Sequence, residues 1–109
     1  MLRIITDNHA NGTELYCSII GATCRVTISN KCPNVAFVSS LVVDRDYRKG
    51  GLGSELLSEV INEAKKRGCS VVSLEVNYKS WQATWYRRVG FIPCCDCYNN
   101  DLITMSLVL

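Results

Sequence analysis

Apolar residues form two kinds of pattern along the chain, and each kind predicts a different element. Runs rich in apolar and β-branched residues predict four strands, at residues 1–6, 13–20, 24–29 and 35–43. Gly21 joins the second and third runs as a hairpin, and turn-forming residues occupy 7–12 and 30–34. The chain is therefore expected to begin with strands and no helix.

From Ser54 to Arg67 the period becomes helical. One face of this segment is apolar and consists of Leu56, Leu57, Val60, Ile61 and Ala64. Gly68 suits the position after a helix end. A strand at 70–76, a short helix at 80–88 and a closing hairpin complete the chain, the hairpin strands being 91–98 and 102–109 around Asn99-Asn100-Asp101. This order predicts an α+β fold, a mixed and mostly antiparallel sheet with helices packed on it, in one domain over 1–109.

Composition narrows the classes of function. The 109 residues carry 12 basic and 10 acidic side chains, and a net charge of +2 is too small to indicate nucleic-acid binding. No apolar run approaches the roughly 20 residues of a membrane span, so no membrane partner is expected. Charge interrupts the first residues too early for a secretory signal, which favours a cytoplasmic location.

Cysteine is the one residue type in unusual excess. Seven cysteines cannot all pair within one chain, and a reducing compartment would keep them as thiols. Cys94-Cys95-Asp96-Cys97 contains a C-x-x-C spacing, but Pro93 and Tyr98 beside it favour a strand. No second pair with zinc-ligand spacing occurs, so small semi-buried thiols are favoured over a metal or redox site. His9 is the single histidine, which excludes a three-histidine metal site and disfavours a histidine-based triad.

The most informative loop lies between the fourth strand and the long helix. It reads Asp46-Tyr47-Arg48-Lys49-Gly50-Gly51-Leu52-Gly53-Ser54. Glycines let backbone N–H groups converge at the positive end of a helix dipole, a common way to bind phosphate. The loop matches neither the Walker A nor the G-x-G-x-x-G pattern. Taken alone, it fits a phosphate site or an ordinary helix entry with a solvated basic rim.

Its context resembles the GNAT acetyltransferase superfamily. Arg48-x-x-Gly51-x-Gly53 follows a strand ending Leu41-Val42-Val43, as in motif A of that family, and Tyr86-Arg87-Arg88-Val89-Gly90-Phe91 resembles its Tyr-x-x-x-Gly-Phe signature. Leu74-Glu75-Val76 is similar to the ribosomal-protein N-terminal acetyltransferases. The resemblance implies a sheet splayed at its central strands and a site for acetyl-CoA. Ser39 and Ser40 fit a local irregularity at the splay, with ordinary strand residues as the alternative. Its implied contacts are the strand edge Leu41, Val42 and Val43 and the loop residues Arg48, Lys49, Gly50, Gly51, Leu52, Gly53 and Ser54.

The resemblance also implies roles for two catalytic residues. Tyr86 matches the general acid that protonates the leaving thiolate, since a phenol is protonated at neutral pH; a packed tyrosine is the alternative. Glu75 matches a general base acting through water, and a solvent-facing carboxylate is the alternative. The expected activity is acetyl-CoA-dependent N-acetyl transfer to a primary amine (a peptide N-terminus, a lysine or a small molecule) by direct attack in a ternary complex. A non-catalytic CoA-binding module is the other possibility.

Two departures from the family bear on the acceptor side. Its last helix opens with Asn-x-x-Ala, where Lys79 and Gln82 stand here, and Asn77 or Ser80 are the candidates to replace the asparagine. The family's N-terminal helices are missing, so the acceptor site should be open or completed by a second copy in a homodimer. Trp81 and Trp85 are expected to pack into the core, with lining of the acceptor site as the alternative.

Overall fold

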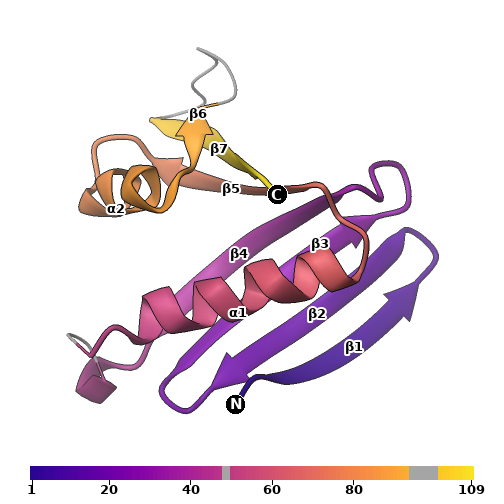
Figure 1. The fold of residues 1–109 in the computed structure, drawn as a ribbon, viewed down its shortest axis with the longest axis horizontal. Helices are drawn as coiled ribbons and strands as arrows, with labels where there is room; N and C mark the ends of the chain where they lie inside the picture. The colour runs from indigo at the N-terminus through magenta and orange to yellow at the C-terminus, as the bar shows by residue number, and fades with distance from the viewer. Residues whose placement is uncertain (48–49, 94–100) are drawn as a thin grey trace.

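The computed structural model describes residues 1–47, 50–93 and 101–109 (Figure 1). Its elements in chain order are β1 (Arg3–His9), β2 (Gly12–Ile19), β3 (Ala22–Ser29), β4 (Val35–Val43), the 3-10 turn η1 (Arg45–Tyr47), α1 (Leu52–Lys66), β5 (Val71–Asn77), α2 (Trp81–Val89), β6 (Ile92–Pro93) and β7 (Leu102–Val108). The strands form one sheet in the order β1-β2-β3-β4-β5-β7-β6. Only β4 and β5 are paired in parallel within these residues, which confirms the predicted mixed sheet.

Several element bounds differ from the sequence prediction for local reasons. β1 continues beyond residue 6 to His9, because its register with β2 extends to the His9–Gly12 pair. α1 begins at Leu52, two residues before Ser54, because Gly51 (φ 76°) turns the chain into the helix. β6 is described only at Ile92–Pro93, and the rest of the expected strand, with Cys94, Cys95 and Cys97, lies outside the described residues.

The core lies on one face of the sheet. Five paired residues, one from each of five neighbouring strands, form a row across this face, and all of them are buried: Leu15, Val26, Val38, Leu74 and Met105. Buried side chains of both α1 and α2 complete the same core. The adjacent row, with Tyr16 and Arg25, points to the opposite face and is exposed. No helix of the described residues covers that second face, and none precedes β4, as the sequence predicts.

The buried cysteines belong to this core. Cys17 and Cys24 lie opposite each other on β2 and β3, and both are free thiols. The hydrogen bond that the Cys24 thiol donates to Cys17, followed by burial, raises the pKa of Cys24 and keeps it a neutral thiol. Within the described part of the chain no cluster of three or more metal-binding side chains occurs. Neither described helix is long and apolar enough to cross a membrane.

One carboxylate is buried on the second face. Glu14 of β2 is 8% exposed and accepts hydrogen bonds from Arg25 Nε (2.6 Å) and Thr27 Oγ1 (3.0 Å) on β3. The hydrogen bond from Arg25 is the main reason why the pKa of Glu14 lies below its ordinary value. The pair therefore links β2 to β3 on the side that the helices leave uncovered.

Candidate functional site

The two parallel strands separate halfway along their length. β4 and β5 pair from Val35–Val71 to Val38–Leu74 and then diverge, although each strand continues. The divergence coincides with an irregularity in β4, where Ser40 adopts a left-handed conformation (φ 56°). Opposite it, the β3–β4 register passes from Thr23–Val42 to Arg25–Ser39, so β4 holds one extra residue. This bulge turns β4 away from β5 and opens a wedge in the sheet.

The loop after β4 is anchored to the neighbouring hairpin. Asp44 N donates to Gly21 O (2.8 Å), and Tyr47 N donates to Asp44 O (2.9 Å). The Tyr47 ring lies directly against Gly21, where an added Cβ would be only 2.5 Å from the ring. Gly21, which has a φ of 88°, is therefore required both for the turn and for this contact. The anchored loop fixes where α1 begins.

The first turn of α1 supplies backbone donors. The first N–H that bonds within the helix is that of Glu55, to Gly51 O (3.0 Å), so the N–H groups of Leu52, Gly53 and Ser54 have no partner in the helix. They border a groove of about 800 Å³. The groove is lined by Leu41, Val42, Val43, Tyr47, Gly51, Leu52, Gly53, Ser54, Trp81, Gln82, Trp85 and Tyr86. Uncharged donors at the positive end of a helix dipole favour an anionic group here.

A second pocket of about 330 Å³ occupies the wedge itself. It is lined by Val38, Ser39, Ser40, Leu41, Leu74, Glu75, Val76, Asn77, Ser80, Gln82 and Tyr86. Val38 and Leu74 point to the helix side, so their neighbours Ser39 and Glu75 point to the opposite side of the sheet. The pocket and the groove share Leu41, Gln82 and Tyr86 and thus meet at these residues.

Tyr86 is placed at this junction by α2. Ser80 caps the helix through a hydrogen bond from Ala83 N, and Tyr86 packs against Trp85 and Phe91 with ring centroids 4.9 and 5.6 Å away. The side chain is 8% exposed, and its hydroxyl makes no hydrogen bond to another described residue. Burial, followed by the nearby Cys24, raises the pKa of Tyr86 above its ordinary value. The phenol therefore remains a proton donor well above neutral pH.

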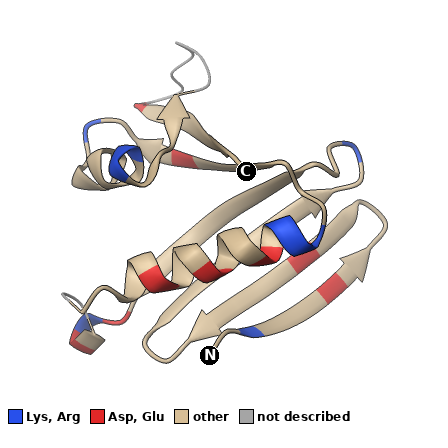
Figure 2. Ribbon diagram, in the orientation of Figure 1, with Lys and Arg blue, Asp and Glu red and all other residues tan. Residues whose placement is uncertain are grey.

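Charged side chains gather away from this junction. Acidic residues run along α1 and basic residues stand at its C-terminal end, as Figure 2 shows. Among the described lining residues of the groove and the pocket, Glu75 is the single charged one. It lies exposed on the side away from the helices, across the wedge from Tyr86. The arrangement places a carboxylate and a phenol on two sides of one opening.

Comparison with known proteins agrees with this geometry. The model of the acetyltransferase (GNAT) family matches residues 9–91. The chain belongs to this family.

Individual relatives match parts of this GNAT chain. An uncharacterized N-acetyltransferase of Methanocaldococcus jannaschii is 40% identical over 58 residues, 52% of this chain and 26% of its own length. A ribosomal protein bS18 alanine N-acetyltransferase of Escherichia coli is 39% identical over 57 residues, 51% of this chain and 38% of its own. The first curated relatives are thus matched over 26–43% of their own lengths.

A solved structure shares the fold over the whole chain. It is a Bacillus subtilis acetyltransferase in complex with CoA, with a TM-score of 0.73 and 16% identity. The match covers 100% of this GNAT chain and 99% of that one. The described sheet and its two helices therefore correspond to a GNAT architecture that exists in a protein of the same size.

The structure brings together most of the residues expected from the sequence. The strand edge Leu41–Val43 and the helix start Gly51–Ser54 border one groove, and Glu75 and Tyr86 border the adjoining pocket. Gly50 is described but does not line the groove. Arg48 and Lys49 lie outside the described residues.

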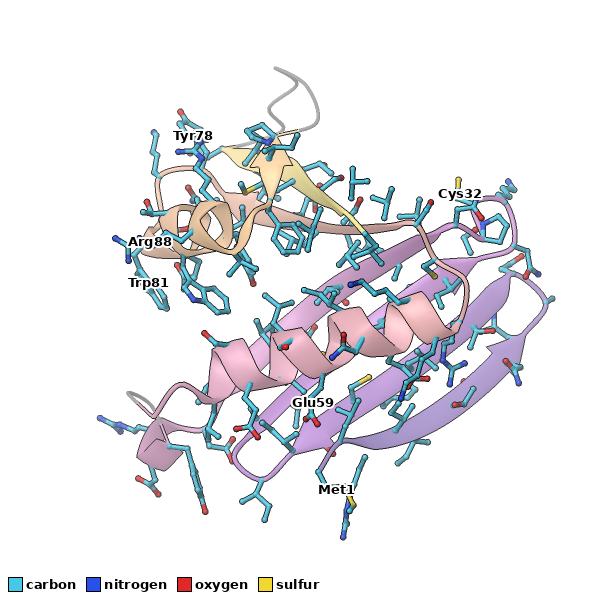
Figure 3. All side chains as sticks on the ribbon, viewed as in Figure 1. Met1, Cys32, Glu59, Tyr78, Trp81 and Arg88 are labelled. Atoms are coloured by element: carbon cyan, nitrogen blue, oxygen red, sulfur yellow. The ribbon has the colours of Figure 1, made fainter. Side chains whose placement is uncertain are left out.

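The structure corrects one expectation for the aromatic residues of α2 in this GNAT chain. The prediction that Trp81 packs into the core was wrong. Its side chain is 72% exposed and points from α2 to the side on which α1 lies (Figure 3). Trp85 is half-buried and packs against the core as expected, and both tryptophans line the groove and not the pocket in the wedge. Asn77 and Ser80, the candidates to replace the family's asparagine, both line the pocket. Each also makes a local hydrogen bond, because Asn77 Oδ1 accepts from Lys79 N (2.9 Å) and the Ser80 hydroxyl donates to Asn77 O (2.6 Å).

Sequence reasoning missed two lining residues of this GNAT domain. Tyr47 was named only as a residue of the loop, yet it lines the groove. Gln82 was seen only as a departure from the family pattern, yet it borders both the groove and the pocket. Its position one helical turn before Tyr86 is the signal that points to it, because residues four apart share a helix face.

Proposed function

We propose that this chain is an acetyl-CoA-dependent N-acetyltransferase that acts on a primary amine. The observation that carries the proposal is the wedge between β4 and β5, where Tyr86 and Glu75 border one pocket that joins the groove at the start of α1. The amine class includes peptide N-termini, lysine side chains and small molecules. The relative from Escherichia coli, whose name specifies an alanine N-acetyltransferase, supports transfer to nitrogen.

The residues of the groove fit acetyl-CoA. The N–H groups of Leu52, Gly53 and Ser54 suit its pyrophosphate, and Arg48 and Lys49 would add positive charge beside them. An added Cβ at Gly53 would have Val43 Cγ2 at 3.5 Å and Trp85 Cη2 at 3.7 Å, so its absence leaves room along the groove floor. The CoA complex of the Bacillus subtilis structure supports this assignment. When bound, acetyl-CoA supplies an acetyl thioester.

The chain's own groups then divide the remaining work. A backbone N–H of β4 at Leu41, beyond the last β4–β5 pair, polarises the thioester carbonyl. Glu75 takes the proton from the acceptor amine through a water molecule, which leaves the nitrogen lone pair free to attack. Tyr86 returns a proton to the departing sulfur, and its raised pKa keeps that proton available.

Transfer is direct, without an acyl-enzyme. No cysteine occurs among the described lining residues of the groove or the pocket. Cys24, the thiol near Tyr86, is buried and its pKa is raised, so it is not a nucleophile. The amine and the thioester therefore react with each other in a ternary complex. The uncovered sheet face leaves the acceptor side open in a single copy, so completion of the pocket by a second copy of the chain remains part of the proposal.

The test is acetyl transfer to a panel of peptide amines, polyamines and amino sugars, with products identified by mass spectrometry. Purified protein is expected to acetylate at least one amine and to lose turnover in Tyr86→Phe. Saturable CoA binding without transfer to any amine would instead identify a CoA-binding module.

A further inference from the structure

Three residues line both the cofactor groove and the acceptor pocket: Leu41, Gln82 and Tyr86. Leu41 contributes its backbone and Tyr86 contributes a proton, but the proposed reaction gives no role to Gln82. Gln82 is nevertheless the one other polar side chain at the place where donor and acceptor must meet. Its position therefore suits a role in binding the acceptor beside the acetyl donor.

The Gln82 side chain is available to a ligand. It lies half-buried in the first turn of α2, one turn before Tyr86, so the two side chains project from the same helix face. Its amide makes no hydrogen bond to another described residue. The neighbouring Asn77 and Ser80, by contrast, have their side chains engaged by the backbone. An amide has two donor hydrogens and an acceptor oxygen, and a ligand that contacts it would satisfy them.

The chemistry of the pocket restricts what that ligand is. Glu75 is the one carboxylate among its described lining residues, and the other polar side chains are neutral hydroxyls and amides. One carboxylate matches one positive charge, which disfavours a polyamine. Three of the four aliphatic residues that line the pocket, Val38, Leu74 and Val76, are 9% exposed or less, so they offer the four methylene groups of a lysine side chain little surface to pack on. An amine with a polar oxygen close to it fits this lining best.

We propose that Gln82 is a specificity-determining residue for the acceptor, its side-chain NH2 donating a hydrogen bond to an oxygen carried next to the reacting amine. The preferred acceptors are then amines with a carbonyl or hydroxyl oxygen on the second carbon from the nitrogen, as in an α-amino amide. This inference rests on the proposed N-acetyltransferase function and adds the class of amine.

Matched pairs of acceptors test the inference. Sec-butylamine has an ethyl group where alaninamide has its carboxamide, and propylamine has a methyl group where ethanolamine has its hydroxyl group. Replacing Gln82 by Ala should lower kcat/KM for alaninamide and ethanolamine by about tenfold, the usual size of one lost hydrogen bond, chiefly through KM. The values for sec-butylamine and propylamine should stay within about twofold. Comparing variant with wild type for each amine cancels the different pKa values of the amines.

Two further variants separate a specific contact from a general effect on α2. Gln82→Asn keeps the amide on a shorter side chain and should recover part of the lost kcat/KM for alaninamide. Thr84→Ala, at an exposed position of the same helix that lines neither cavity, should match wild type with every amine. The dissociation constant of CoA, measured by calorimetry, should be the same in all four proteins.

Several results would overturn the inference. An equal loss for both members of a pair, no loss for either, or weakened CoA binding in Gln82→Ala would each contradict an acceptor contact. Wild-type protein that acetylates no amine would overturn the proposed function and this inference with it. An active wild type with the wrong pattern would overturn this inference alone.

Discussion

Val38 and Leu74 form the last pair of the parallel ladder between β4 and β5. Beyond this pair, the two strands at the centre of the sheet lose contact, and the pocket that holds Glu75 and Tyr86 occupies the space between them. The bulge at Ser40 is the local cause. The one-residue bulge in β4 thus accounts for the pocket between β4 and β5.

Substitution of Ser40 tests the bulge. Ser40→Val places a β-branched residue at a φ of 56° and should destabilise the fold by roughly 1–2 kcal/mol, the usual penalty of a left-handed conformation. Ser40→Gly removes the side chain that disfavours this conformation and should be at least as stable as wild type. Urea unfolding measures both. A Val variant as stable as the Gly variant would mean that the left-handed conformation is not required.

Tyr86→Phe tests the proton donor. The variant should lose about a hundredfold or more in kcat, because the leaving thiolate is no longer protonated, while CoA affinity and stability stay near wild type. Tyr16→Phe, on the uncovered sheet face, is the matched control with unchanged kcat. Unaltered turnover in Tyr86→Phe would remove the assigned role.

The raised pKa of Tyr86 also predicts the alkaline pH dependence. A general acid works in its protonated form, so kcat should not fall through loss of this proton until the pH exceeds the ordinary tyrosine value of about 10. A pH–rate profile measured on wild type up to that range is the check. An alkaline decline well below it, absent from Tyr86→Phe, would mean that the phenol is not held in its protonated form.

Gly53→Ala separates cofactor binding from folding. The nearest atoms to an added Cβ are 3.5 Å away, an ordinary contact, so the variant should fold with nearly unchanged stability. The same methyl group would occupy the groove beside the helix donors, and CoA should bind about tenfold or more weakly, as when a close ligand contact is lost.

Gly68→Ala is the opposite case and serves as its control. Gly68, after the end of α1, has a φ of 86°, so alanine there should lower the melting temperature and leave CoA affinity unchanged. Thermal unfolding and calorimetry of both variants give the comparison. Equal CoA affinity in Gly53→Ala and wild type would place the cofactor elsewhere.

Glu14 predicts how stability depends on acid. Its pKa is lowered in the folded state, first by the hydrogen bond from Arg25, so its contribution is present above its unfolded value near 4.5 and is lost as the pH falls through the folded value. Glu14→Gln should therefore melt at a lower temperature than wild type at pH 7, and the difference should shrink as the pH falls below 4.5. A difference that stays constant with pH would show that the ionised form does not matter.

The sequence predicts the fold well where the physical signal is local. The strands that carry Val38 and Leu74 follow from runs of apolar and β-branched residues, and the apolar face of α1 follows from its helical period. The end of β1 at His9 was not predicted, because residues 7–12 are of the types that form turns, whereas the structure continues the pairing to His9–Gly12 and leaves only a tight hairpin. Ser39 and Ser40 fitted a local irregularity of the strand, which the structure confirms, but the left-handed conformation of Ser40 itself could not be predicted, since serine rarely adopts it.

The residues of the site likewise fall into those that the sequence predicts and those that it does not. The loop from Gly51 to Ser54 and the positions of Glu75 and Tyr86 were predicted from family resemblance, and the structure brings them to one opening. The exposure of Trp81 was not, because an aromatic residue at a helix start fits core packing equally well until the wedge beside it is known. The helical spacing of Gln82 and Tyr86 places both on one face of α2, but only the structure shows that the groove and the pocket meet at Gln82.

Calorimetric titration of the purified protein with acetyl-CoA tests the central claim most directly. The account predicts saturable binding of one acetyl-CoA per chain, weakened in Gly53→Ala and unchanged in Gly68→Ala. No binding heat at any accessible concentration, confirmed by a second binding measurement, would contradict the assignment of the groove at the start of α1.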